Sequence, residues 1–168
     1  MRFILFDRVV ELKKGHGAIL IKNVSQSEDY FMDHFPGFPV VPGSIILGSF
    51  EQGAELLLGA TYDFKLRPVL QRVTRASFRH FVVPGDQLEL HLTLSPDSPT
   101  RVQATAKVRE KRVADARFDF SLQETEGNSE ALEACQRLKL FYDLLNSDPL
   151  TEVWDLWAGQ KDDGGNEE

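Results

Sequence analysis

Residues 33–43 read Asp33-His34-Phe35-Pro36-Gly37-Phe38-Pro39-Val40-Val41-Pro42-Gly43, and this stretch decides the fold that the rest of the sequence predicts. Three prolines and two glycines among eleven residues exclude a regular helix or strand. The chain that follows carries apolar residues at helical spacing, namely Ile46, Phe50, Ala54, Leu57 and Leu58. We therefore predict a helix over residues 44–59, apolar around most of its girth and hence buried. The stretch places a histidine in a stiff loop at the start of that helix.

Alternating apolar and polar residues predict strands on both sides of the helix. Residues 3–24 form two strands joined by a glycine-bearing turn. Residues 66–122 form further strands, including one over residues 75–83 and one in which every second residue from Leu88 to Leu94 is leucine. Two strands, one buried helix and a run of antiparallel strands predict an α+β fold whose sheet wraps around the helix.

A C-terminal helical extension is predicted after a polar linker. We expect Ser129 to cap a helix with one apolar stripe, formed by Leu132, Cys135, Leu138, Phe141 and Leu145. Asp148-Pro149 should start a second, short helix. The pair should dock on the domain through Leu138, Phe141, Trp154 and Trp157. We divide the chain into a core domain at 1–124, a helical extension at 125–158 and a disordered acidic tail at 159–168.

Composition restricts the possible functions. The 168 residues suit one domain, and the net charge of -7 argues against nucleic acid as a partner. No apolar run approaches the ~18 residues of a membrane span, so we expect no membrane partner. Asp7 and Arg8 interrupt the apolar start, which makes a poor signal peptide and predicts a cytoplasmic protein. Cys135 stands alone, which excludes an intrachain disulfide and a cysteine-based zinc site.

Positive charge is concentrated between residues 65 and 79. This segment carries Lys65, Arg67, Arg72, Arg75 and Arg79. A basic stripe on an acidic protein suggests a site for an acidic partner or a phosphate. A solvated strand face is the plainer alternative.

His34 and the start of the helix together suit one kind of chemistry. An imidazole takes up a proton at neutral pH, and a helix amino terminus offers free N–H groups. A base and an N–H donor are what removal of a proton beside a carbonyl requires, because the donor stabilises the enolate oxygen. A structural or idle histidine is the alternative.

The segment His34-Phe35-Pro36-Gly37-Phe38-Pro39-Val40-Val41-Pro42-Gly43 resembles the HFPGxPxxPG motif of the FabZ/FabA-type 3-hydroxyacyl-acyl-carrier-protein dehydratases. Residues 6–9, 22–24 and 78–87 resemble further segments of that family, so the likeness extends over residues 2–122. The resemblance implies a hot-dog fold, an antiparallel sheet wrapped around one long central helix.

The same resemblance implies a reaction and its residues. His34 matches the catalytic histidine, the Val40 carbonyl orients it, the Gly43 N–H binds the thioester oxygen, and Gln52 matches a glutamine of the central helix. The implied reaction is syn loss of water from a (3R)-3-hydroxyacyl thioester on acyl carrier protein, without metal or organic cofactor. The implied assembly is a homodimer or larger, with histidine and acid from different chains.

Gly48 departs from this pattern, because it stands where the family carries its catalytic acid. Glu51 lies one turn on, ~4.5 Å along the axis, and is either a displaced acid or a group paired at a subunit contact. Glu55 is two turns on and too far. We expect glycine to leave room for a side chain at position 48.

Three functions remain open. The first is a working dehydratase with a rearranged acid. The second is a catalytically degenerate subunit that binds acyl carrier protein or pairs with an intact dehydratase. The third, a hot-dog thioesterase, is disfavoured by the motif.

Overall fold

The computed structural model describes residues 4–146, which form six strands, two α-helices and one short 3₁₀ helix. The elements are β1 (Arg8–Lys13), β2 (Gly17–Asn23), η1 (Asp29–Met32), α1 (Gly43–Thr61), β3 (Leu66–Phe78), β4 (Gln87–Ser95), β5 (Ser98–Val108), β6 (Lys111–Glu124) and α2 (Ser129–Asn146). The predicted order of two strands, a helix and a run of strands is confirmed.

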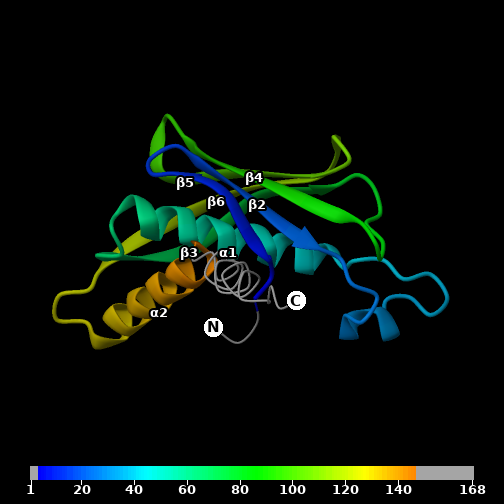
Figure 1. The fold of residues 1–168 in the computed structure, drawn as a ribbon. Helices are drawn as coiled ribbons and strands as arrows, with labels where there is room; N and C mark the ends of the chain where they lie inside the picture. The colour runs from blue at the N-terminus through cyan, green and yellow to red at the C-terminus, as the bar shows by residue number, and fades with distance from the viewer. Residues whose placement is uncertain (1–3, 147–168) are drawn as a thin grey trace, which may run out of the picture.

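One antiparallel sheet organises the fold, with strands in the order β1-β2-β4-β5-β6-β3. Figure 1 shows α1 running along the sheet, with α2 on the side of α1 away from it. Alternate residues of the inner strands, such as Leu20, Leu90 and Phe118, are fully buried beneath Phe50 and Leu57 of α1. The sheet and the neighbouring elements enclose α1 on most sides, so the apolar residues around its circumference are buried. The predicted α+β hot-dog architecture is confirmed.

The strand predicted over residues 75–83 is wrong beyond Phe78, and residues 75–78 are the end of a longer strand. β3 is one strand that pairs with β6 from Leu66 opposite Glu124 to Phe78 opposite Ala114. The Arg79 N–H still donates to the Val113 carbonyl of β6 at 2.8 Å, after which the chain leaves the sheet. The Val82 carbonyl then accepts a hydrogen bond from the Val41 N–H, also at 2.8 Å. Residues 79–86 therefore form a loop, although their apolar residues resemble a strand. This loop lies beside residues 33–42, which we call the histidine loop.

The expected cap and stripe of α2 need correction. The Asn128 side-chain oxygen accepts the Ala131 N–H at 3.0 Å, so Asn128 and not Ser129 caps the helix. Leu132 is 45% exposed, whereas Ala131, Cys135, Leu138 and Phe141 are buried. The true stripe includes Ala131, one helical position before Leu132 and about 100° around the axis.

Two expectations about the C-terminal end of the chain concern residues after 146. The second C-terminal helix, with Trp154 and Trp157, and the acidic tail at 159–168 lie outside the described residues. Neither α1 nor α2 is both long and apolar enough to cross a membrane.

Candidate active site

The imidazole of His34 is held by the backbone of its own loop. The Val40 N–H donates to the His34 carbonyl at 3.1 Å, and His34 Nδ1 lies 3.1 Å from the Val40 carbonyl oxygen. Because a carbonyl oxygen can only accept, Nδ1 carries the proton in this contact. Nε2 is therefore the unprotonated nitrogen of the neutral ring and the one able to act as a base.

A tight turn closes the loop between these two residues. Phe35 and Phe38 exchange backbone hydrogen bonds of 3.1 and 2.9 Å across Pro36-Gly37. Gly37 has φ +78°, which the third residue of a type II turn requires and which side chains disfavour. Proline and glycine thus fix the position of the loop relative to α1.

The first turn of α1 follows directly. The Pro42 carbonyl accepts the N–H groups of Ile45 and Ile46, whereas the N–H groups at the very start of a helix have no intrahelical acceptor. A Cβ at Gly43 would lie 3.1–3.2 Å from the ring of Phe78. Glycine at this position therefore allows Phe78 to pack closely over the helix start.

Neighbouring loops hold this region in place. Besides the Val41–Val82 hydrogen bond, Val24 exchanges backbone hydrogen bonds with Gly85 and Asp86 at 2.9 and 3.0 Å. The histidine loop and the 79–86 loop are thereby tied to each other and to the end of β2.

Large apolar side chains are exposed around the histidine. Phe38 and Phe81 pack edge to face with ring centroids 5.6 Å apart, although both rings are more than half exposed. The other exposed apolar side chains of η1, of these loops and of β3 are Met32, Phe35, Val73, Phe78 and Val83. β3 is also an edge strand, so both its backbone and this apolar surface are available to another chain.

The space expected beside Gly48 is occupied by the end of one side chain, that of Leu5. A Cβ at Gly48 would lie 2.8 Å from Cδ1 of Leu5. Leu5 is fixed on α1 because its N–H donates to the Gln52 side-chain oxygen at 2.9 Å and its carbonyl accepts from the Ser49 hydroxyl at 2.9 Å. Gln52, assigned to substrate binding by resemblance, is thus engaged with the N-terminal segment in this chain.

The two glutamates of α1 lie in different surroundings. Glu51 is half-buried, and burial raises its pKa. Within residues 4–146, no hydrogen bond or ion pair joins Glu51 to His34. Burial, together with the nearby Glu51 carboxyl, raises the pKa of Glu55 to about 7, against the opposing charge of Arg67.

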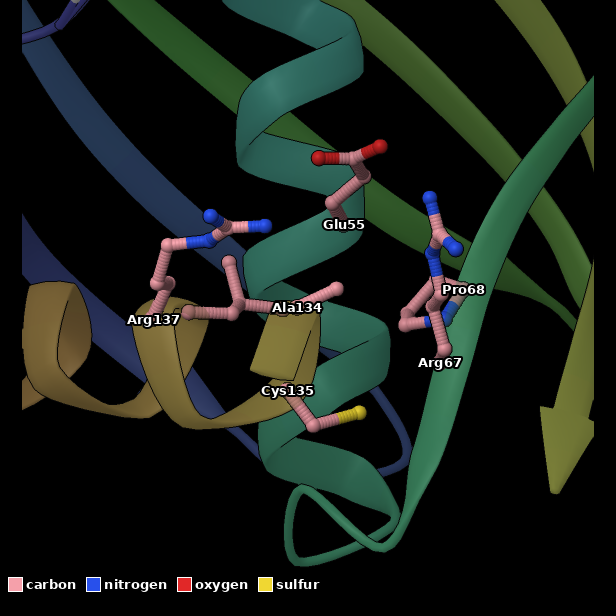
Figure 2. Close-up of a pocket in the computed structure, with 7 residues that line it drawn as sticks. Glu55, Arg67, Pro68, Ala134, Cys135 and Arg137 are labelled. Carbon is pink, nitrogen blue, oxygen red and sulfur yellow. The ribbon is translucent and has the colours of Figure 1, made fainter. Parts of the chain in front are cut away.

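Glu55 lines a pocket of about 210 Å³ between α1, β3 and α2. Figure 2 shows its carboxyl group extending from α1, with Arg137 of α2 on one side and Arg67 of β3 on the other. Pro68, Ala134, Cys135 and Leu138 complete the lining. Sequence spacing could not reveal this pocket, because it depends on where α2 docks.

The basic stretch is not one stripe. Lys65 is exposed before β3, and Arg67 pairs with Glu130 of α2 at 2.9 Å. Arg72, Arg75 and Arg79 instead lie up to ~40 Å further along the extended chain, on the face of the sheet away from α1.

That outer face carries what we call the outer arginine cluster: Arg72, Arg75, Arg79, Arg101, Arg112 and Arg117, together with Asp115 and Asp119. Hydrogen bonds from Arg101 and Arg72 lower the pKa of Asp119. Six arginines and two aspartates leave four positive charges on an otherwise acidic protein. Arg101, Arg112 and Arg117 escaped notice in the sequence because strand pairing alone brings them to this face.

Within the described residues, no group of three or more His, Cys, Asp or Glu side chains is placed to hold a metal ion.

The fold and the histidine loop define a dehydratase-like hot-dog protein. Residues 11–129 match the model of the ApeI-like family, described as ApeI dehydratase. The 3-hydroxyacyl-[acyl-carrier-protein] dehydratase FabZ of Lactobacillus helveticus is 39% identical over 121 residues, which are 70% of this chain and 82% of that one. The FabZ of Pelotomaculum thermopropionicum is 36% identical over 123 residues, 71% of this chain and 88% of that one. The chain belongs to the ApeI-like/FabZ dehydratase family.

Solved structures support the fold. The dehydratase heterocomplex ApeI:P from Xenorhabdus doucetiae matches with a TM-score of 0.55 and 16% identity, covering 71% of this chain and 98% of that one. A hot-dog-like protein from Thermanaerovibrio acidaminovorans matches with a TM-score of 0.58 and 16% identity, covering 71% and 89%.

Proposed function

We propose that this protein dehydrates (3R)-3-hydroxyacyl thioesters carried by acyl carrier protein. The observation that carries the proposal is the contact between His34 Nδ1 and the Val40 carbonyl, which leaves Nε2 available as a base close to the start of α1. The names of the FabZ relatives support this substrate class.

Each step of the reaction has a group in this chain. The thioester oxygen accepts a hydrogen bond from the Gly43 N–H, which stabilises negative charge as it develops. His34 Nε2 takes the proton from C2, and the electron pair of that C–H bond forms the C2=C3 double bond. The C3–O bond breaks, and the hydroxide that leaves takes up a proton to become water.

Gly48 offers no group to supply that last proton. In a syn elimination the C2 proton and the C3 hydroxyl leave from the same face, so the His34 imidazolium can return its proton to the departing hydroxide. Glu51 is the other candidate donor within this chain, because its raised pKa keeps it protonated to higher pH than an ordinary glutamate. Either route is slower than one with an acid at position 48.

Turnover of a (3R)-3-hydroxyacyl-acyl carrier protein by the purified chain tests this function. We expect slow formation of the trans-2-enoyl product by the parent chain and a loss of ~10²–10⁴-fold in His34→Ala. Equal rates in the two proteins, with both shown to be folded, would contradict the proposal.

A second function is favoured by Gly48 and by the exposed surface around His34. An apolar rim and an unpaired β3 edge suit a second hot-dog chain, and a chain with an acid on its central helix would complete the His34 site. The neighbouring ApeI:P structure is itself a heterocomplex. In this form the protein pairs with an intact dehydratase and supplies the histidine of one shared site; a homodimer joined through β3 is the other assembly.

Complementation separates the two assemblies. The chain is mixed with a dehydratase from the same cell whose own catalytic histidine has been replaced by alanine. A shared site predicts activity only in the mixture, and its loss when His34→Ala replaces the parent chain. A mixture that stays inactive, with light scattering showing no complex between the two, would exclude this second function.

The outer arginine cluster is the surface that we assign to acyl carrier protein. Its excess of positive charge suits an acidic partner, and the side chains of Arg72 and Arg75 are 70% and 65% exposed despite their ion pairs. Asp119 and Asp115 also pair with Arg101 and Arg79, so they keep a partner when Arg72 and Arg75 turn to a carboxylate of the carrier.

A further inference from the structure

A buried lysine lies at the end of β2 that is closest to the histidine loop. Lys22 is on the inner face of β2 and only 4% exposed, and its Nζ donates to Glu28 Oε1 at 2.9 Å. Its backbone is fixed in the sheet opposite Leu88 of β4. A buried ammonium group costs free energy unless it is paired with a negative charge. The ion pair with Lys22 therefore fixes the position of the Glu28 carboxylate beside the end of β2.

Glu28 is connected to His34 by the backbone hydrogen bonds of η1 and the turn that follows it. It directly precedes η1, and its carbonyl accepts the Phe31 N–H at 3.1 Å. The Tyr30 carbonyl in turn accepts the His34 N–H at 3.0 Å. η1 therefore links the ion pair to the upstream side of His34, while Val40 holds the downstream side.

Few side-chain hydrogen bonds or ion pairs connect residues 25–33, which include η1, to the sheet. Among residues 4–146, the Lys22–Glu28 pair is the one side-chain hydrogen bond or ion pair that links residues 25–33 to a strand. Tyr30 adds none, because its buried hydroxyl has no hydrogen-bond partner in the described chain. The position of η1 thus depends on apolar packing of Phe31 and Tyr30 and on this ion pair.

We propose that Lys22 and Glu28 are positioning residues for His34, which anchor η1 so that the imidazole meets Val40 in one orientation. The expected loss of turnover when the ion pair is broken rests on the proposed dehydratase function. The expected loss of a single orientation of the His34 imidazole does not. Small displacements of a catalytic group reduce rates strongly, up to ~10²-fold for about 1 Å.

Two measurements test this proposal. Lys22→Met removes the charge and keeps the length of the side chain, and we expect kcat to fall by ~10–100-fold with little change in KM. Lys22→Arg should recover most of the loss. The matched control is Lys14→Met, which breaks the ion pair between Lys14 in the β1–β2 turn and Asp63 in the α1–β3 connection and should leave kcat unchanged.

The second measurement is NMR of the His34 ring nitrogens, identified by their loss in His34→Ala. The parent chain should show one tautomer with Nδ1–H hydrogen-bonded, and Lys22→Met should show a tautomer mixture or exchange-broadened signals. If Lys22→Met does not fold, Glu28→Gln, which preserves shape, takes its place. A parent-like His34 spectrum in the folded variant would overturn the proposal, whether or not the chain has activity. If the parent chain is inactive but the spectrum changes as expected, the positioning role stands and the dehydratase function fails.

Discussion

Leu5 covers the face of the central helix at Gly48, with its Cδ1 atom 2.8 Å from where a Cβ at Gly48 would lie. The segment that carries Leu5 is bound to α1 through Ser49 and Gln52, so this contact is part of the packing of the fold. By the resemblance of the His34 motif, position 48 is where we expect the catalytic acid of the family. A side chain introduced at position 48 would therefore meet the end of the Leu5 side chain, which has to shift to admit it.

A glutamate introduced at position 48 should raise dehydratase activity most when the Leu5 side chain is shortened. We expect Gly48→Glu to increase dehydratase kcat/KM by at least ~10-fold, because general acid help is worth ~10²–10⁴-fold and the Leu5 contact removes part of it. Gly48→Glu combined with Leu5→Ala should exceed the single variant. Glu51→Gln should have little effect. If Glu51→Gln abolishes a robust activity and neither Gly48 variant gains, Glu51 is the acid.

Glu55 should make stability depend on pH. Its folded pKa of about 7 lies above its ordinary value of 4.5, so the folded state holds this proton more tightly than the unfolded state. The stabilisation is complete below about pH 4.5 and is lost as pH rises through about 7, by at most about 3.5 kcal/mol at about 1.4 kcal/mol per pKa unit. Urea unfolding between pH 5 and 8 should show this fall, and Glu55→Gln should remove most of it.

Glu51→Gln should reduce the fall as well, because the pKa of Glu51 is itself raised and its carboxyl helps to raise the pKa of Glu55. A parent chain as stable at pH 8 as at pH 5 would mean that Glu55 is already ionised in the folded protein.

Docking of α2 should contribute strongly to stability. Phe141 is 7% exposed and its ring centroid lies 5.5 Å from that of Phe6, so Phe141→Ala should destabilise the protein by ~3–5 kcal/mol. Leu140, the preceding residue, is 71% exposed, and Leu140→Ala should change stability by less than ~0.5 kcal/mol. Equal melting temperatures for the two variants would show that α2 is not docked in solution.

The outer arginine cluster should affect binding of acyl carrier protein and not the rate of the chemical step. Arg72→Glu combined with Arg75→Glu should raise the apparent KM for an acyl-carrier-protein substrate and leave a small pantetheine substrate nearly unchanged. The carrier KM should also rise with salt, because exposed charges are screened over ~8–10 Å. Lys65→Glu, at the other end of the original stretch, is the control. Equal losses on both substrates would assign these arginines to the fold.

The sequence predicted the fold well because the decisive features were local. Proline and glycine around His34 and the apolar girth of the following helix required no knowledge of distant contacts. The errors arose where a contact across the fold overrides a local pattern. Residues 79–86 look like a strand but bond to Val41, and Gly48 looks like open space but is covered by Leu5. The environment of Glu55 and the outer arginine cluster likewise depend on helix docking and strand pairing.

The central claim is that His34 removes the C2 proton of an acyl thioester. Exchange of that proton with D₂O on a saturated acyl thioester, which has no 3-hydroxyl to lose, measures this step without any acid. The account predicts exchange by the parent chain, the same exchange by Glu51→Gln, and a fall of at least ~100-fold in His34→Ala. Exchange at the parent rate in His34→Ala, or none in the parent chain, would contradict it.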